Sequence, residues 1–118
     1  MKITIYNQKQ LGEKKKYGDV TISKRELTAG VKDWYPIQPI IPKCGGKVLV
    51  QFKYYKPKGN ANHSVSVTVM KAQGLVNGYS EAPPTTQAVL HLIPNLISHT
   101  TAMKPSDSNP EFMEYFTL

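Results

Sequence analysis

The feature that most constrains the fold of this chain is a strict alternation of apolar and polar residues. In residues 64–69, valine occupies every odd position and serine or threonine every even position. Successive side chains of a β-strand point to opposite faces of its sheet, so a period of two predicts a strand with one buried and one solvated face. An amphipathic helix would instead repeat its apolar residues every three or four positions.

The same pattern recurs along the chain and predicts eight strands. In residues 47–55, Val48, Val50 and Phe52 fall on one face of the predicted strand. Shorter segments of β-type composition, separated by Gly, Pro or Asn, complete the set: 2–6, 18–23, 33–37, 88–93, 98–103 and 112–118. Eight short strands in 118 residues predict one all-β domain, a sandwich or a barrel.

The helical signal is confined to one short segment. Ser23 and Glu26 have the spacing of a capping box, which favours one turn of helix over residues 23–27. The same polar residues also suit a loop, so both interpretations stay open at this point.

Composition excludes several classes of protein. No run of 18 apolar residues is present, which predicts no transmembrane segment. The first residues lack the apolar stretch of a signal peptide, so we expect a cytoplasmic protein. The single cysteine, Cys44, cannot form an internal disulfide, and its Pro/Gly-rich surroundings predict an exposed, unreactive thiol.

No motif supports catalysis. The chain has no Gly-x-Ser-x-Gly elbow and no Gly-rich phosphate loop, and its three histidines are scattered. We therefore expect a protein that is not an enzyme and that uses no cofactor.

The positive charge is concentrated in one half of the chain. The formal net charge is +7, and residues 1–58 contain 13 Lys or Arg but only 4 Asp or Glu. Residues 59–118 contain 2 and 4, respectively. A basic half suggests an acidic partner, which can be anionic lipid, nucleic acid or an acidic protein.

Motifs in the second half, taken in order, resemble one family. A strand at 46–54 is followed by a strand that ends in the Ala-x-x-Leu turn Ala72–Leu75. Residues 109–116 match an Asn-Pro-x-Phe-x-Glu-x-Phe pattern, and weaker matches lie at 77–81, 88–94 and 100–104. This series resembles the opening five strands of the C2-domain family of membrane-targeting β-sandwiches.

The first half resembles the remaining strands of that family. Residues 3–7 are similar to its sixth strand, 17–22 to its seventh, and Leu27, Gly30 and the pair Trp34 and Tyr35 to its closing pattern. The resemblance implies an eight-stranded antiparallel Greek-key β-sandwich, C2-like and circularly permuted. Residues 1–37 would supply the family's C-terminal strands, 38–46 a linker, and 47–118 its N-terminal strands. The alternative is a segment that spans two tandem C2 domains, whose halves fold together or form a domain-swapped dimer.

The resemblance implies that the family's calcium site is lost. Asn7, Lys9 and Lys15 align with positions that usually hold aspartate, Leu75 lies near another, and only Glu81 supplies a carboxylate there. Calcium requires six to eight oxygen ligands. We therefore expect no metal site and a calcium-independent domain.

The densest charge run is the candidate lipid-binding site. We expect Lys9, Lys14, Lys15 and Lys16 to lie in a loop over residues 7–17 and to contact anionic phospholipid, at roughly 1 kcal/mol per lysine. Leu75 and Tyr79, in the opposing loop, would add apolar contact. The alternative is a solvated loop without a ligand.

Other candidate surfaces are weaker. The family's second lipid site aligns with Val89, His91, His99 and Thr101, none of which is a lysine. Tyrosines and lysines alternate in residues 53–60, but no accompanying motif supports binding of nucleic acid, which we rank as unlikely. The resemblance implies that Trp34 is buried in the core.

The sequence thus predicts a calcium-independent C2-type module, cytoplasmic and peripheral to the membrane, that docks to anionic phospholipid. The alternative is a protein–protein interaction or scaffold module without lipid binding.

Overall fold

The computed structural model describes residues 1–8, 14–30, 32–55, 64–78, 81–92 and 97–117. Within these residues the chain is mostly β-structure, as expected. The elements, in order, are β1 (Lys2–Gln8), β2 (Lys14–Thr21), α1 (Lys24–Ala29), β3 (Lys32–Pro36), β4 (Gln38–Pro39), β5 (Lys47–Tyr55), β6 (Ser64–Gln73), β7 (Thr86–Leu92), β8 (Ile97–Thr100) and β9 (Glu111–Thr117). Each predicted strand overlaps one of these, and the two-residue β4 is additional.

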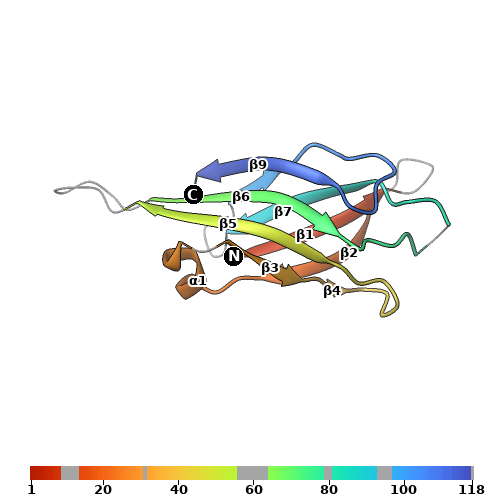
Figure 1. Ribbon diagram of the computed structural model, residues 1–118, viewed down its shortest axis with the longest axis horizontal. Coiled ribbons are helices and arrows are strands. Elements are labelled where there is room, and N and C mark those ends of the chain that lie inside the picture. The colour runs from red at the N-terminus through yellow and green to blue at the C-terminus, as the bar shows by residue number, and fades with distance from the viewer. Residues whose placement is uncertain (9–13, 31, 56–63, 79–80, 93–96, 118) are drawn as a thin grey trace.

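The strands form two antiparallel sheets, which face each other as two layers (Figure 1). The five-stranded sheet has the order β4-β2-β1-β7-β8, and the four-stranded sheet has the order β3-β5-β6-β9. Residues 1–39 and 47–117 contribute strands to both sheets. Two pairings join the segments, β1 with β7 and β3 with β5. The two parts of the chain therefore share one core.

The core lies between the inner faces of the two sheets. In β5 and β6, the alternating residues Val48, Val50, Phe52, Val67 and Val69 are fully buried, as the pattern predicts. The facing sheet contributes further aliphatic side chains: Ile3, Ile5, Val20, Ala88 and Leu90. This continuous apolar layer is the main source of stability, because burial of apolar area drives folding.

The segment between β3 and β5 is packed rather than loose. Pro36 and Lys47 are cross-strand partners, so the intervening residues connect neighbouring strands. Ile37 and Cys44 are buried, and the Cys44 N–H donates to the carbonyl of Ile41. The expectation of an exposed Cys44 is wrong, because this turn directs the thiol into the core.

The expectation that Trp34 lies in the core is also wrong. Trp34 is half-buried on the outer face of the four-stranded sheet, beside its cross-strand partner Leu49. The ammonium groups of Lys47 and Lys71 lie 4.7 and 5.8 Å from the centroid of the indole. Leu49 is only 7% exposed although its neighbours Val48 and Val50 face the core. The outer face therefore carries a small cluster of its own.

The capping box at Ser23 forms a helix and not a polar loop. The Ser23 Oγ accepts a hydrogen bond from the Glu26 N–H at 3.3 Å and donates to the Glu26 carboxylate at 3.1 Å. Gly30 ends α1 at φ 69°, a left-handed conformation that favours glycine. Leu27 is buried, so the helix closes one end of the sandwich.

Two adjacent glycines provide a matched test of packing at the start of β5. Gly46 has φ +114°, and a Cβ there would lie 2.7 Å from the Gln73 carbonyl oxygen and 2.9 Å from the Leu75 Cδ2. A Cβ at Gly45 would meet nothing within 4 Å. We expect Gly46→Ala to lower the free energy of unfolding by about 3 kcal/mol, through strain and overpacking. Urea denaturation of Gly46→Ala and of the control Gly45→Ala measures the change in the free energy of unfolding. An equal loss of stability in Gly45→Ala would contradict the prediction.

Candidate functional site

The lysine run lies on a strand, and not in a loop as the sequence suggested. β1 extends to Gln8 and β2 begins at Lys14, so Lys14, Lys15 and Lys16 are hydrogen-bonded ladder residues. The long loop was predicted because three consecutive lysines show no hydrophobic alternation. Their β-structure comes from pairing with β1, whose apolar alternation is clear. Lys9 lies outside the described residues.

Alternation along β2 separates the three lysines. Lys14 and Lys16 are exposed, whereas Lys15 is half-buried and is the cross-strand partner of the buried Asn7. Lys14 Nζ donates a hydrogen bond of 2.7 Å to the Gln87 Oε1 on β7. Lys14 and Lys16 thus belong to the outer face of the five-stranded sheet, and Lys15 points to the other side.

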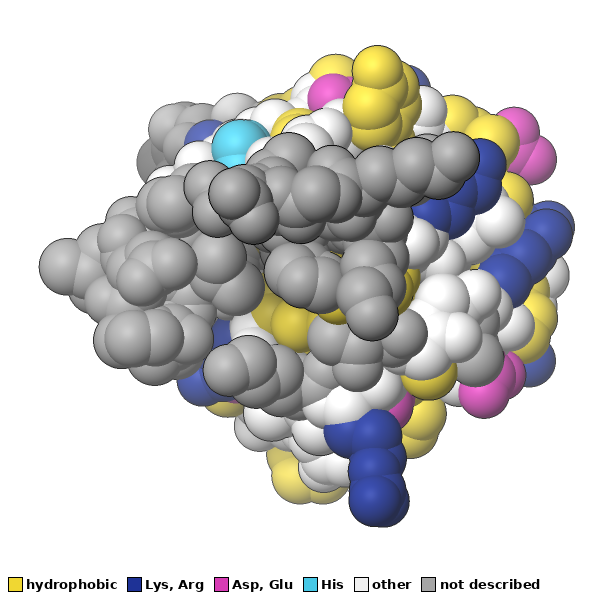
Figure 2. Space-filling model, turned by 90° about the vertical axis from the view of Figure 1, so that its left-hand side faces the viewer, with side chains coloured by type: hydrophobic (Ala, Val, Ile, Leu, Met, Phe, Trp, Pro, Cys, Tyr) yellow, Lys and Arg dark blue, Asp and Glu magenta, His cyan; other side chains and the backbone are white. Residues whose placement is uncertain are grey.

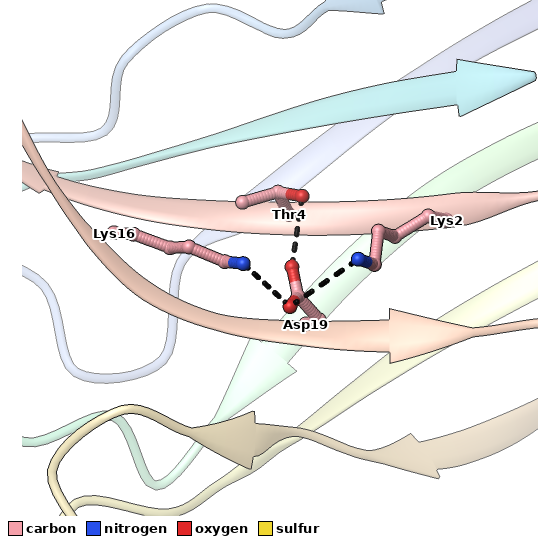
Figure 3. Close-up of polar contacts among 4 residues, drawn as sticks. All are labelled: Lys2, Thr4, Lys16 and Asp19. Atoms are coloured by element: carbon pink, nitrogen blue, oxygen red, sulfur yellow. Dashed lines mark hydrogen bonds and ion pairs between the residues drawn. The ribbon is translucent and has the colours of Figure 1, made fainter.

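Asp19 organises the positive charge of this outer face (Figure 3). The Asp19 carboxylate lies 2.7 Å from Lys16 Nζ and 3.7 Å from Lys2 Nζ, and the two lysines approach it from opposite sides. Its other oxygen accepts a hydrogen bond of 2.9 Å from the Thr4 hydroxyl. Thr4 is only 3% exposed although it faces outward, because this cluster surrounds it. We call Lys2, Lys14, Lys16 and Asp19 the lysine face.

The electrostatics of the lysine face leave an excess of positive charge. Burial raises the pKa of the Asp19 carboxyl, but hydrogen bonds from Lys16 and Thr4 and the charges of both lysines outweigh it. The pKa therefore lies below its usual value, and Asp19 is ionised at neutral pH. The lysine face then carries three ammonium groups and one carboxylate, of which Lys2 and Lys16 pair with Asp19.

A β-bulge makes this arrangement possible. Residues three apart on a regular strand point to opposite faces, yet Lys16 and Asp19 form an ion pair. The register between β1 and β2 shifts between Ile5 and Tyr6, which leaves Tyr17 as the extra residue. Tyr17 is buried, and its hydroxyl donates to the Gly45 carbonyl and accepts from the Val76 N–H at 3.1 Å.

Leu75, a predicted lipid-inserting residue, is not part of the surface. It is only 1% exposed and belongs to the core, and its N–H donates to the Ser108 carbonyl at 3.0 Å. The resemblance placed Leu75 in an exposed loop, whereas the backbone turns the side chain inward. Tyr79 lies outside the described residues.

The positions aligned with the family's second lipid site do not form one surface. Val89 and His91 lie on β7 opposite Thr4 and Lys2 of the lysine face. His99 instead stacks on Phe116, with ring centroids 4.9 Å apart. Thr101 is 2% exposed, and its hydroxyl accepts from the Ala88 N–H. Only His91 of the two histidines thus neighbours the lysine face.

Two further findings bear on metal ions and membranes. In the described ranges, no group of three or more His, Cys, Asp or Glu side chains is placed to hold a metal ion. Of the aligned calcium positions, Asn7 is buried and donates to the Asn77 side chain, and Glu81 is exposed. No helix among the described residues is long and apolar enough to cross a bilayer.

Charge at the end of the molecule is more dispersed than on the lysine face. In the end view (Figure 2), the Lys and Arg side chains that are coloured lie around the periphery as separate groups, with uncharged and acidic side chains between them. The lysine face differs because Lys2 and Lys16 share the Asp19 carboxylate, and Lys14 lies on the same sheet face. Sequence reasoning missed Asp19, Thr4 and Gln87 in this site. The available signal was the Gly18 that follows the lysines, since glycine in a strand often marks a bulge.

Comparison of the chain with protein-family models, with curated proteins and with solved structures finds no match.

The Asp19 cluster predicts a pH-dependent contribution to stability. A carboxyl whose pKa is lowered by folding stabilises the protein above its unfolded pKa of roughly 3.9, and this contribution disappears as the pH falls through the folded value. We expect Asp19→Asn to lower the free energy of unfolding by about 1 kcal/mol at pH 7, because three partners lose their acceptor charge.

Urea denaturation at neutral and at strongly acidic pH measures this difference. The two proteins should converge in acid, where wild-type Asp19 is protonated. Asp33→Asn, at an exposed carboxylate outside the lysine face, serves as the control. If Asp19→Asn remained less stable than the wild type by the same free energy in acid, the cluster would act through shape and not through charge.

Proposed function

We propose that this chain is a calcium-independent C2-type module that docks to anionic phospholipid through its lysine face. The module would work at the cytoplasmic side of a membrane, as a peripheral protein, because anionic lipids are enriched in that leaflet. The observation that carries the proposal is the grouping of Lys2, Lys14 and Lys16 on one sheet face, with a single carboxylate among them.

The strand arrangement supports a C2-type fold in permuted order. The segment matched to the family's first strand, 46–54, and the Trp34 and Tyr35 pair of its closing pattern are neighbours on β5 and β3. β6 and β9 pair in one sheet although the β7–β8 hairpin between them lies in the other, as a Greek-key connection requires.

The lipid contact that we propose is electrostatic. Each lysine near an anionic leaflet contributes roughly 1 kcal/mol, so three supply about 3 kcal/mol. The burial of Leu75 removes one of the two apolar contacts that the sequence suggested. Binding should therefore be weak for the isolated domain, sensitive to salt and independent of calcium.

The test is co-sedimentation with liposomes that contain or lack phosphatidylserine, in the presence of a chelator. We expect Lys14→Gln combined with Lys16→Gln to weaken binding roughly thirtyfold, which corresponds to about 2 kcal/mol. The combination of Lys43→Gln and Lys104→Gln removes the same charge outside the lysine face and should leave affinity nearly unchanged.

Two results would overturn lipid docking. Equal binding to neutral liposomes would show that the contact is not electrostatic. No binding to acidic liposomes, or equal loss in both double variants, would favour the alternative of a protein-interaction module.

A further inference from the structure

The outer face of the four-stranded sheet carries a second basic cluster, centred on Trp34. The cross-strand row Trp34, Leu49 and Lys71 spans three neighbouring strands, and Lys47 lies on the middle one. Both ammonium groups lie within 6 Å of the indole centroid, at 4.7 Å for Lys47 and 5.8 Å for Lys71. The indole is thus the common contact of two cations, and cation–π attraction holds them in place.

These two cations differ from the lysines of the opposite face. Lys16 and Lys2 share the carboxylate of Asp19, whereas neither Lys47 nor Lys71 forms an ion pair within the described part of the chain. Two like charges held around one ring repel each other. An anion that lies between them would relieve this repulsion, so the cluster favours a negatively charged ligand.

The surrounding surface extends the positive charge. Lys32 and Lys53 also belong to the outer face, because they pair with the outward-facing Gln51 and Ser66. Glu111, the cross-strand partner of Lys71, is the acidic residue of this face among the described strands. Four lysines therefore accompany one carboxylate over β3, β5, β6 and β9.

An exposed aromatic side chain lies on the same face. Tyr115 on β9 is 69% exposed and lies in the cross-strand row of Gln51 and Thr68. A flat sheet that presents lysines and an accessible aromatic ring suits single-stranded nucleic acid, whose phosphates contact the cations and whose bases stack on the rings. The outer faces of the two sheets point in opposite directions, so a bilayer against the lysine face would not cover this surface.

We propose that Trp34, Lys47 and Lys71, with Tyr115, form a binding site for the phosphate backbone and bases of single-stranded nucleic acid. Lys47 and Lys71 hold a backbone phosphate over the indole, and Tyr115 stacks on a base further along the strand. From the sequence, nucleic-acid binding ranked as unlikely because no accompanying motif supported it, and Trp34 was expected in the core. The proposal is independent of lipid docking.

The test uses Trp34, the single tryptophan of the chain, as a local reporter. Titration with an oligodeoxythymidine of about ten nucleotides should quench its fluorescence. In Lys47→Gln combined with Lys71→Gln, the affinity should fall, and the slope of log affinity against log salt should decrease in magnitude by roughly 0.7, for the one phosphate that the two lysines hold. Tyr115→Ala should weaken binding about tenfold.

Controls separate this site from other anion-binding surfaces. The matched double variant Lys43→Gln and Lys104→Gln should bind the oligonucleotide with nearly the same dependence of log affinity on log salt as the wild type. Unchanged Trp34 fluorescence during the oligonucleotide titration would overturn the proposal. So would equal quenching by inorganic phosphate, or quenching by phosphatidylserine vesicles alone, because either would assign the cations to a different ligand. Vesicle binding by the double variant Lys14→Gln and Lys16→Gln tests only lipid docking through the lysine face, and not nucleic-acid binding at Trp34.

Discussion

The pairing of β1 with β7 is the interaction on which the rest of this structure depends. It joins the two ends of the five-stranded sheet, because β4 and β2 lie on one side of it and β8 on the other. Ile3 pairs with Leu90 and Ile5 with Ala88, and all four side chains are buried at 1% exposure or less. Without this pairing the sheet would separate into β4-β2-β1 and the hairpin β7-β8, and a two-stranded hairpin is marginally stable alone.

The lysine face depends on the same pairing. Lys14 on β2 reaches Gln87 on β7 across β1, and Lys2 on β1 reaches Asp19 on β2. Three strands must therefore be in register before the positive charges can meet on one surface. The β-bulge at Tyr17 adds the final constraint, since it places Lys16 and Asp19 on the same side. Gly18 tolerates the close approach of β4, where a Cβ would lie only 2.5 Å from the Gln38 carbonyl oxygen.

The two outer faces show how similar charges acquire different environments. On one face, the Asp19 carboxylate accepts hydrogen bonds from Lys16 and from the Thr4 hydroxyl, so part of the positive charge is neutralised locally. On the other, an indole holds two ammonium groups that form no ion pair among the described residues, although Glu111 is the cross-strand partner of Lys71. A lysine that is paired with a carboxylate attracts an external anion less strongly, because the carboxylate neutralises its charge. A lysine that contacts an aromatic ring keeps most of its attraction for an anion, because the ring compensates only part of the positive charge.

Sequence reasoning was most successful where the local pattern reflects burial. The valines of β5 and β6 and the capping box at Ser23 behave as their spacing predicts, because alternation and capping are properties of neighbouring residues. It failed for Cys44, whose Pro/Gly-rich surroundings suggested an exposed thiol, and for Leu75 and Trp34, whose environments were expected from the family resemblance. For Leu75 and Trp34 a distant segment decides the outcome: the Ser108 carbonyl orients the backbone at Leu75, and lysines from two other strands surround Trp34.

The sequence by itself determined the all-β class and most strand positions, since the side-chain period of two is inherent in a strand. Only the tertiary structure decided which lysines share a face. That outcome depends on register, and a bulge of one residue reverses the orientation of every side chain beyond it. No local pattern in the run Lys14, Lys15 and Lys16 specifies the bulge at Tyr17, because pairing with β1 and hydrogen bonds to Gly45 and Val76 hold it in place.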